Sequence, residues 1–352
     1  MTQQILDGIV QHSVTTPRLT ANVLERPSAT AARTVVFVHG NVSSSLFWQP
    51  SMLGLDPEIR ALAVDLRGFG DSQTLPVDAT RGVRDFSDDV ASVLDALGLD
   101  AVNLVGWSMG GGVVMQLLLD HPERVLSLTL VSPVSPYGFG GTRADGSAID
   151  AVGAGTGGGG ANPDFVARLE AHDTGEDGPT SPRMVYRTAY VKDPAPLAQY
   201  EDLWVESMLT TKTGPDNYPG DSTPTDAWPG FAAGTRGVLN TMVPKYFDVS
   251  GIADLAVKPP LLWLRGVDDA IVSDASFFDI NYLGQVGVIP GWPGEDVAPA
   301  QPMIQQTRAV FDRYAAGGGS VTEISAEGTG HSFHLERPEE FRAALERHLI
   351  SG

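Results

Sequence analysis

The feature that most constrains the fold is a series of short apolar runs that alternate with helical patterns. The runs are Val35–Val38, Arg60–Asp65, Ala101–Val105, Val125–Val131, Pro260–Leu264 and Val321–Ser325. Runs of this length, rich in Val, Leu and Ile, are typical of strands covered on both faces. Residues 83–97 and 338–350 instead place their apolar side chains at helical spacing. This alternation predicts an α/β protein with a mostly parallel central sheet and flanking helices.

The residues before this pattern and two stretches that interrupt it define the expected domain organisation. Upstream, Ile9–Val14 and Leu19–Leu24 predict an antiparallel hairpin at the edge of the sheet. Residues 133–258 contain no convincing strand, but helical patterns recur there over 163–171, 183–191, 197–210 and 235–247. We therefore expect a core formed by residues 1–132 and 259–352, with 133–258 inserted as a large helical cap. A second stretch, 276–319, is rich in Pro and Gly, with a helix expected near 301–315, and is interpreted as an enlarged loop beside the cap.

Composition and charge exclude several classes of function. The chain has 43 acidic and 23 basic residues, a net charge of −20, and no basic run, so we expect no nucleic-acid partner. It has no cysteine, which excludes disulfides, thiolate zinc sites and cysteine nucleophiles.

The sequence also bears on location. The opening residues MTQQILDGIV lack the pattern of a secretory signal, and the uncharged stretch 101–119 is interpreted as a strand, a turn and a helix instead of a membrane span. We expect a cytoplasmic protein with no membrane span. The sequence does not indicate the oligomeric state.

The first candidate for chemistry is Gly106-Trp107-Ser108-Met109-Gly110, a G-x-S-x-G pattern. It follows a predicted strand and precedes a predicted helix, which is the context of a nucleophile elbow. Small residues two positions before and after the serine allow a sharp turn that exposes Oγ at the carboxyl edge of the sheet. We predict that Ser108 is a nucleophile; the structural alternative is a buried glycine-rich turn with an incidental serine.

The second candidate is His39-Gly40-Asn41, which directly follows Val35–Val38. Acyl transfer develops an oxyanion, and a pair of aimed backbone N–H groups stabilises it. We predict that the backbone amides of Asn41 and Met109 form this oxyanion hole. His39 itself is expected to brace the loop and not to transfer protons.

Taken together, these motifs resemble the α/β-hydrolase fold superfamily in its serine esterase and lipase branch. The resemblance depends, in chain order, on VVFVHGN (35–41), DLRGFGDS (65–72), GWSMGGG (106–112), RGVDDAIV (265–272) and GTGHSFHLERPEEF (328–341). It implies that Ser108 is the nucleophile, Asp269 the acid and His331 the base, in the chain order of this fold. It also implies a covalent acyl-enzyme and no cofactor.

Two neighbouring pairs offer alternatives within this triad. Asp268 and Asp269 are adjacent, and the resemblance favours Asp269, three residues after Gly266; Asp268 is expected to accept N–H groups of its own turn. His331 and His334 share a Gly-rich loop, and we assign His331 as the base. A metal bound by these two histidines would need further ligands, and none stands at recognisable spacing, so no metal site is expected.

The expected substrate is a small, mostly apolar carboxylic ester or lactone. Residues 133–258 are rich in aromatics, which could line such a pocket or form the core of the cap itself. Perhydrolysis, C–C bond hydrolysis and a ligand sensor with a slow triad are the alternatives, and GWSMGGG is also similar to cofactor-free haloperoxidases. The tract Gly153–Gly160 formally matches a dinucleotide fingerprint but follows no strand, so it is interpreted as flexible. The loop Asp65–Ser72 is expected to shape the edge of the site.

Overall fold

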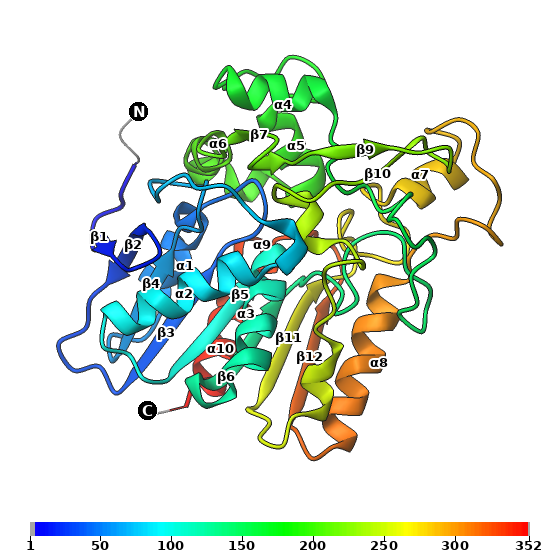
Figure 1. Cartoon of the computed structure of the whole chain (residues 1–352). Helices are drawn as coiled ribbons and strands as arrows, with labels where there is room; N and C mark the ends of the chain where they lie inside the picture. Colours follow the sequence, from blue (N-terminus) through cyan, green and yellow to red (C-terminus); the bar gives the residue numbers. More distant parts are fainter. Residues whose placement is uncertain (1–3, 351–352) are drawn as a thin grey trace.

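The computed structural model describes residues 4–350 and contains an eight-stranded sheet with helices on both faces (Figure 1). The strand order is β1-β2-β4-β3-β5-β6-β11-β12. The first three strands of this order pair antiparallel and the remaining neighbours pair parallel. The strands are β1 (Val10–Thr15), β2 (Thr20–Arg26), β3 (Arg33–Val38), β4 (Ile59–Val64), β5 (Val102–Trp107), β6 (Val125–Val131), β11 (Leu261–Gly266) and β12 (Val321–Ala326).

The expected sheet is confirmed, with one correction. All six apolar runs correspond to strands β3, β4, β5, β6, β11 and β12, and the upstream hairpin is β1–β2 at the edge. Strand β12, however, is not covered on both faces, and most of its residues are half-buried or exposed. It is the last strand of the sheet, and its Glu323 forms ion pairs with Arg265 and Arg308 at the surface.

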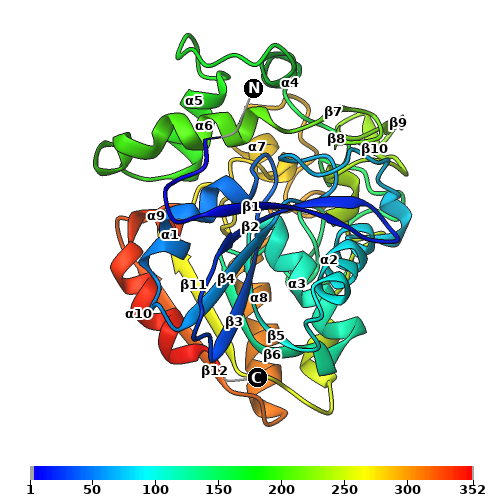
Figure 2. The same ribbon diagram turned by 90° about the vertical axis from the view of Figure 1, so that its left-hand side faces the viewer.

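Helices cover the two faces of the sheet. Helices α2 (Arg84–Ala96) and α3 (Met109–Asp120) lie on one face, and α1 (Gln49–Gly54) and α10 (Pro338–His348) on the other (Figure 2). Helix α8 (Met303–Ala316) packs beside α3 through the intervening turn Ser250–Asp254. A short helix, α9 (Phe333–Glu336), precedes α10. The buried strands between these layers form one continuous apolar core.

Residues 133–258, which we call the middle segment, lie between β6 and β11 and add no strand to the large sheet. The segment contains α4 (Pro163–Glu170), α5 (Pro182–Val185), a π-helix (Tyr186–Tyr190) and α6 (Glu201–Leu209), grouped at one end of the sheet (Figure 1). These helices occupy the three ranges predicted from the sequence.

Two expectations for the middle segment were wrong. It does contain strands, β7 (Thr213–Gly214) with β8 (Tyr218–Pro219) and β9 (Ser222–Pro224) with β10 (Phe231–Ala233). Strands of two or three residues are too short to show a period in the sequence. No long helix spans 235–247, where only the 3₁₀ turn Leu239–Met242 forms. Pro244 cannot continue a helix, and Gly237 packs directly against the backbone of Gly220.

The glycine tract 153–160 is packed, which corrects its interpretation as a flexible stretch. Gly153, Gly155, Gly157 and Gly159 all have positive φ. A Cβ at Gly158 would lie 2.6 Å from the Val243 side chain, and one at Gly159 would overlap the carbonyl oxygen of Asp221. The glycines are therefore required by close backbone approach and by conformation.

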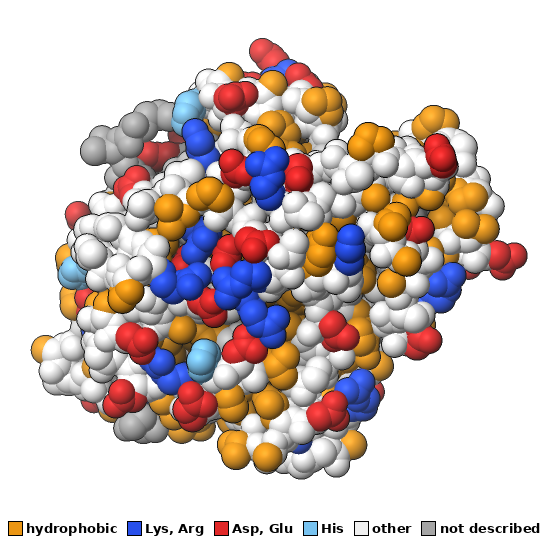
Figure 3. All heavy atoms as spheres, in the orientation of Figure 1, with side chains coloured by type: hydrophobic (Ala, Val, Ile, Leu, Met, Phe, Trp, Pro, Cys, Tyr) orange, Lys and Arg blue, Asp and Glu red, His pale blue; other side chains and the backbone are white. Residues whose placement is uncertain are grey.

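The stretch after β11 carries most of the large apolar side chains that face solvent. It contains α7 (Ile280–Gln285) and six of the exposed ones: Val267, Phe277, Phe278, Val286, Val288 and Val297. Figure 3 shows hydrophobic side chains gathered over α7 and the segment that follows it. Over α2, in contrast, acidic and basic side chains alternate, with Arg84 bound to Asp120. Within residues 4–350, no helix has both the length and the hydropathy needed to cross a membrane.

Candidate active site

Ser108 occupies a sharp turn between β5 and α3. Its φ of +57° and ψ of −121° lie outside the regions that most residues adopt. Gly106 and Gly110 make this turn sterically feasible, because a Cβ at Gly106 would overlap the Gly110 carbonyl and one at Gly110 would overlap the backbone of β3. Ser108 donates its N–H to the Val131 carbonyl at 3.0 Å and its side chain is only half-buried. The turn predicted from G-x-S-x-G is thus confirmed as backbone geometry.

The loop after β3 lies directly against Ser108. A Cβ at Gly40 would lie 2.9 Å from Ser108 Cβ, so glycine permits this close approach. His39 Nε2 accepts the Leu66 N–H at 3.0 Å, and Nδ1 therefore donates to the Gly40 carbonyl at 2.7 Å. Burial lowers the pKa of His39, which keeps its ring neutral. The expectation that His39 braces this loop is confirmed.

The two backbone amides predicted to form an oxyanion hole belong to Asn41 and Met109. Met109 is the first residue of α3, and Asn41 follows Gly40. Neither N–H donates a hydrogen bond to an acceptor in the part of the chain that the structure describes. The amino end of α3 adds a favourable electrostatic contribution for a negative charge beside Ser108.

Asp269 and His331 form a buried pair. Asp269 Oδ2 accepts the hydrogen bond from His331 Nδ1 at 2.9 Å, and both side chains are 2% exposed. The second oxygen, Oδ1, accepts the N–H groups of Ile271 at 2.8 Å and Val272 at 3.0 Å. Because both carboxylate oxygens are occupied, the orientation of Asp269 is fixed, and with it the orientation and tautomer of His331.

Trp107 connects this pair to the turn that carries Ser108. Its indole Nε1 donates to the His331 carbonyl at 3.1 Å, and the two rings lie 5.6 Å apart. Since Trp107 immediately precedes Ser108, this hydrogen bond holds the loop that carries His331 beside the turn that carries Ser108. Among residues 4–350, Ser108 Oγ and His331 form no hydrogen bond. Such contacts between nucleophile and base often become short only when substrate is bound.

Asp268 points away from His331. Its Oδ2 accepts the Gly328 N–H at 2.8 Å, and its Oδ1 lies 3.3 Å from Lys192 Nζ. The hydrogen bond from Gly328 and the nearby Lys192 lower the pKa of Asp268. The expectation that Asp268 accepts backbone N–H groups of its own turn was wrong in one respect. The donor belongs to the loop before His331, because β11 and β12 are neighbours and their loops meet.

His334 is a core residue. Its ring lies 4.3 Å from that of Trp48 and 5.0 Å from that of Trp107, and it is 1% exposed. Neither ring nitrogen has a hydrogen-bond partner in the described chain. Burial, and then the proximity of His331, lower the pKa of His334 well below its usual range, so this ring is neutral. The structure therefore places the two histidines in different surroundings, with His331 paired with Asp269 and His334 packed among aromatic rings.

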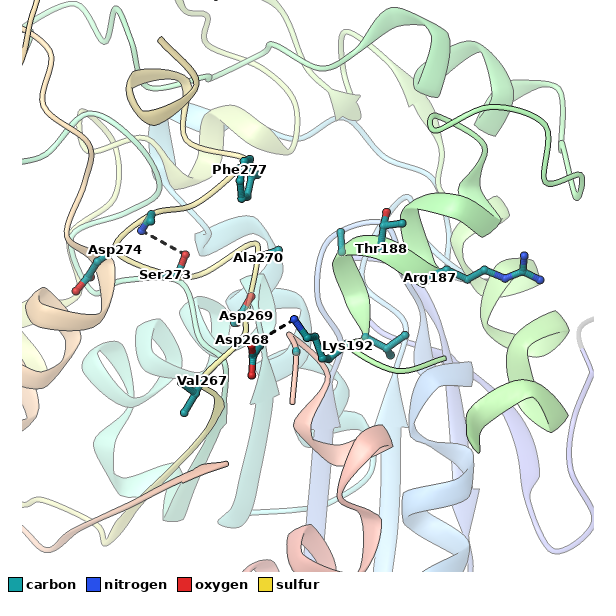
Figure 4. Close-up of a pocket in the computed structure, with 14 residues that line it drawn as sticks. Arg187, Thr188, Lys192, Val267, Asp268, Asp269, Ala270, Ser273, Asp274 and Phe277 are labelled. Atoms are coloured by element: carbon teal, nitrogen blue, oxygen red, sulfur yellow. Dashed lines mark hydrogen bonds and ion pairs between the residues drawn. The ribbon is translucent and has the colours of Figure 1, made fainter. Parts of the chain in front are cut away.

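A cavity of about 630 Å³ opens beside the Asp269–His331 pair. Arg187, Thr188 and Lys192 lie on one side of it and the stretch 267–277 on the other, with Lys192 and Asp268 pointing toward one another (Figure 4). Asp269 and Gly330 belong to its lining, whereas Ser108 does not.

The sequence left two roles open for the aromatics of the middle segment, as pocket lining or as the core of the segment. Among the described residues that line this cavity, the one aromatic side chain is Phe277, which lies outside the middle segment. Tyr186 and Trp204 of the middle segment pack on one another at 5.6 Å, and Trp204 stacks on Phe47 at 6.0 Å. These aromatics form a core because the segment needs apolar surface to hold its short helices together. In the described residues, no group of three or more His, Asp or Glu side chains is arranged to hold a metal ion.

Three residues that contact the site were not singled out from the sequence. They are Trp107, Tyr190 and Glu336, whose hydrogen bonds to His331, Asn41 and Lys192 join loops that are far apart in the chain. Trp107 could have been noticed, because it lies inside the G-x-S-x-G pattern. Tyr190 and Glu336 gave no local signal, since their partners are set by the tertiary fold.

Comparison with known proteins agrees with this architecture. A family model described as alpha/beta hydrolase fold matches residues 33–150. A carboxylesterase of Bacillus subtilis (strain 168), YbfK, is 32% identical over 106 residues, which cover 30% of this chain and 36% of the relative. The chain thus matches only about a third of that relative's length.

Two other matches extend over most of the chain. A 2-(acetamidomethylene)succinate hydrolase of Mesorhizobium japonicum is 25% identical over 288 residues, covering 81% of this chain and 88% of the relative. The solved structure of an esterase from Exiguobacterium antarcticum superposes with a TM-score of 0.57 at 19% identity, covering 96% and 98% of the two chains. The sheet order, the turn at Ser108 and these matches lead to one conclusion: the chain has the α/β-hydrolase fold.

Proposed function

We propose that this protein is a serine hydrolase that cleaves carboxylic esters or lactones through a Ser108–His331–Asp269 triad. His331 takes the proton of the Ser108 hydroxyl as the oxygen attacks the substrate carbonyl. Asp269 holds the neutral tautomer of His331 and stabilises the imidazolium that forms. The N–H groups of Asn41 and Met109 stabilise the oxyanion, and water then hydrolyses the acyl-enzyme with His331 as base.

The observation that supports this proposal most strongly is the buried His331–Asp269 pair. Its 2.9 Å hydrogen bond uses one carboxylate oxygen while two backbone N–H groups hold the other. A carboxylate so constrained is suited to orient one imidazole. The backbone carbonyl of that same histidine accepts a hydrogen bond from Trp107, the residue next to Ser108.

Esters are the favoured substrate class because of the relatives and the site. A curated carboxylesterase and a solved esterase are both similar to this chain. The cavity is lined by apolar Ala189, Val191 and Phe277 together with the Lys192–Asp268 ion pair, so its chemistry is mixed. The net charge of −20 disfavours strongly anionic substrates at long range. In this proposal the middle segment is the cap above the site.

A second candidate is hydrolysis of an amide-type bond by the same triad. The relative that aligns over 81% of this chain is named for hydrolysis of 2-(acetamidomethylene)succinate. The same acyl transfer chemistry would apply, with nitrogen in place of oxygen as the leaving atom. A panel of p-nitrophenyl esters, lactones and N-acetyl enamines distinguishes the two candidates by kcat/KM.

The test of the proposed function is Ser108→Ala measured on the best substrate of that panel. Loss of the nucleophile of a triad lowers kcat by about 10⁶. The melting temperature should stay close to that of the wild type, because Ala adopts the same backbone conformation and the serine hydroxyl has no hydrogen bond. Turnover that survives the substitution would exclude Ser108 as the nucleophile.

A further inference from the structure

The stretch Tyr190–Asp193, which we call the bridge segment, has a role that the triad does not explain. It begins at the last residue of the π-helix of the middle segment and lines part of the cavity through Val191 and Lys192. Its residues form polar contacts with three of the four core loops that carry the proposed catalytic groups; the turn with Ser108, after β5, is the fourth. The three contacted loops follow β3, β11 and β12, and are far apart in the sequence.

The first contact joins the bridge segment to the loop after β3. Tyr190 Oη lies 3.0 Å from the carbonyl oxygen of Asn41 and 3.1 Å from that of Val42, so its proton is shared between them. Val42 has a φ of +46°, an unusual conformation for a β-branched residue that needs support from its surroundings. Tyr190 is 6% exposed, so no water replaces its hydroxyl without rearrangement.

The second contact joins the bridge segment to the loop after β12. Glu336 Oε2 accepts the Lys192 N–H at 2.7 Å, while its Oε1 accepts the Gly330 N–H at 2.7 Å. One carboxylate thus binds the residue next to His331 and the bridge segment at the same time. The two backbones are close, since a Cβ at Gly330 would lie 2.8 Å from Lys192 N.

The third contact involves the loop after β11 and is weaker. Lys192 Nζ lies 3.3 Å from Asp268 Oδ1, and Asp268 also accepts the Gly328 N–H. Lys192 is 54% exposed in its side chain, so this ion pair is screened by water. The main constraints are therefore those of Tyr190 and Glu336.

We propose that the bridge segment sets the spacing between the loop after β3, which carries Asn41, and the loop after β12, which carries His331. Tyr190 and Glu336 act as positioning residues. Through Tyr190 it fixes the carbonyls of Asn41 and Val42, and hence the backbone conformation of the loop that presents the Asn41 N–H. Through Glu336 it fixes Gly330, and hence His331. This inference rests on the proposed function, because it assigns these loops to catalysis.

The first test compares two tyrosines of the same π-helix. Tyr190→Phe keeps the ring and removes the hydroxyl that contacts both carbonyls. Tyr186→Phe is the matched control, because the Tyr186 hydroxyl is also buried but has no hydrogen-bond partner. We expect Tyr190→Phe to lower kcat roughly tenfold with KM little changed, since a displacement of about 1 Å in a catalytic group costs up to about a hundredfold. Tyr186→Phe should behave as the wild type.

The second test addresses the other end of the bridge segment. Glu336→Gln replaces one acceptor oxygen by an NH₂ group, which cannot accept the N–H of Gly330 or Lys192. Glu340→Gln is the matched control, because Glu340 is exposed on α10. We expect Glu336→Gln to lower kcat roughly tenfold, and Glu340→Gln to behave as the wild type.

Two measurements distinguish a positioning role of Tyr190 and Glu336 from a merely structural one. The first is kcat per active site, titrated by the burst of p-nitrophenol, which removes any effect of unfolded protein. The second is the affinity for a trifluoromethyl ketone, which forms a tetrahedral oxyanion on the nucleophile. In Tyr190→Phe this affinity should fall in parallel with kcat/KM, whereas a structural role would lower only the number of active sites and the melting temperature.

The outcomes distinguish this inference from the proposed function. If the wild type shows no burst and Ser108→Ala changes nothing, the proposed function is wrong and the bridge inference is overturned with it. If Ser108→Ala is inactive but Tyr190→Phe and Glu336→Gln match their controls per titrated site, the bridge inference alone is overturned. Losses confined to Tyr190→Phe and Glu336→Gln support it.

Discussion

The large sheet and the middle segment position side chains in different ways. In the sheet, ladders of backbone hydrogen bonds fix the ends of β3, β5 and β11. Ser108 directly follows β5, and Asp269 is the third residue after β11. In the middle segment, short helices are joined by loops with glycines at positive φ, and single side chains such as Tyr190 make the contacts. The comparison teaches that in the proposed mechanism the sheet would set the positions of the catalytic groups, whereas single side chains of the middle segment would adjust them.

The largest expected effect concerns the two histidines after β12. His331→Ala should lower kcat by about 10⁶, because the nucleophile then lacks its base. His334→Phe should keep nearly full activity, since a phenyl ring fills the same aromatic cluster with Trp48 and Trp107. The measurement is kcat on the best ester. An inactive His334→Phe that remains folded would move the base to His334.

The next effect concerns the two aspartates after β11. Asp269→Asn should lower kcat by about 10⁴, because an amide cannot both hold the tautomer of His331 and accept two backbone N–H groups. Asp268→Asn should cost far less, since Asp268 contacts only Gly328 and the exposed Lys192. Both variants are assayed per titrated active site. If the losses are reversed, the acid is Asp268.

A third prediction compares a glycine from each region at nearly equal φ. Gly98 ends α2 with a φ of +67° and has open space for a Cβ, whereas Gly159 has a φ of +68° and no room for one. Gly98→Ala should lower the free energy of unfolding by about 1 kcal/mol, the cost of a left-handed conformation alone. Gly159→Ala should cost about 3 kcal/mol or more, because the Asp221 backbone must also move. Urea unfolding measures both, and equal costs would show that the glycine tract is loosely packed after all.

The smallest expected effect is the pH dependence of stability due to His334. Its folded pKa lies well below the unfolded value of 6.5, so below pH 6.5 the unfolded chain binds a proton here that the folded chain does not. The free energy of unfolding therefore falls as the pH is lowered through the unfolded pKa of this residue. His334→Phe should remove the contribution of His334 to this pH dependence. The contributions of His39 and His348, whose pKa values are also lowered, should remain. An unchanged pH dependence would contradict the burial of a neutral His334.

The same contrast between regions explains how much the sequence could predict. The strands of the large sheet were found because buried parallel strands are continuous apolar runs, and Ser108 was found because only a glycine-flanked turn allows its conformation. The choice of Asp269 over Asp268 depended on resemblance, since adjacent carboxylates are equivalent until β11 and β12 pair. The glycine tract was misjudged, because composition does not show whether Val243 or Asp221 packs against it. The links of Tyr190 to Asn41 and of Glu336 to Lys192 could not be found, because the tertiary fold alone brings these residues together.

The most direct test of the central claim is the site at which a fluorophosphonate binds covalently. Intact-mass and peptide mapping of the treated protein should show one adduct, on the peptide that contains Ser108. The adduct should be absent in Ser108→Ala and form far more slowly in His331→Ala, because the base activates the hydroxyl. An adduct on a different serine, or labelling of the wild type no faster than that of His331→Ala, would contradict the assignment of this triad.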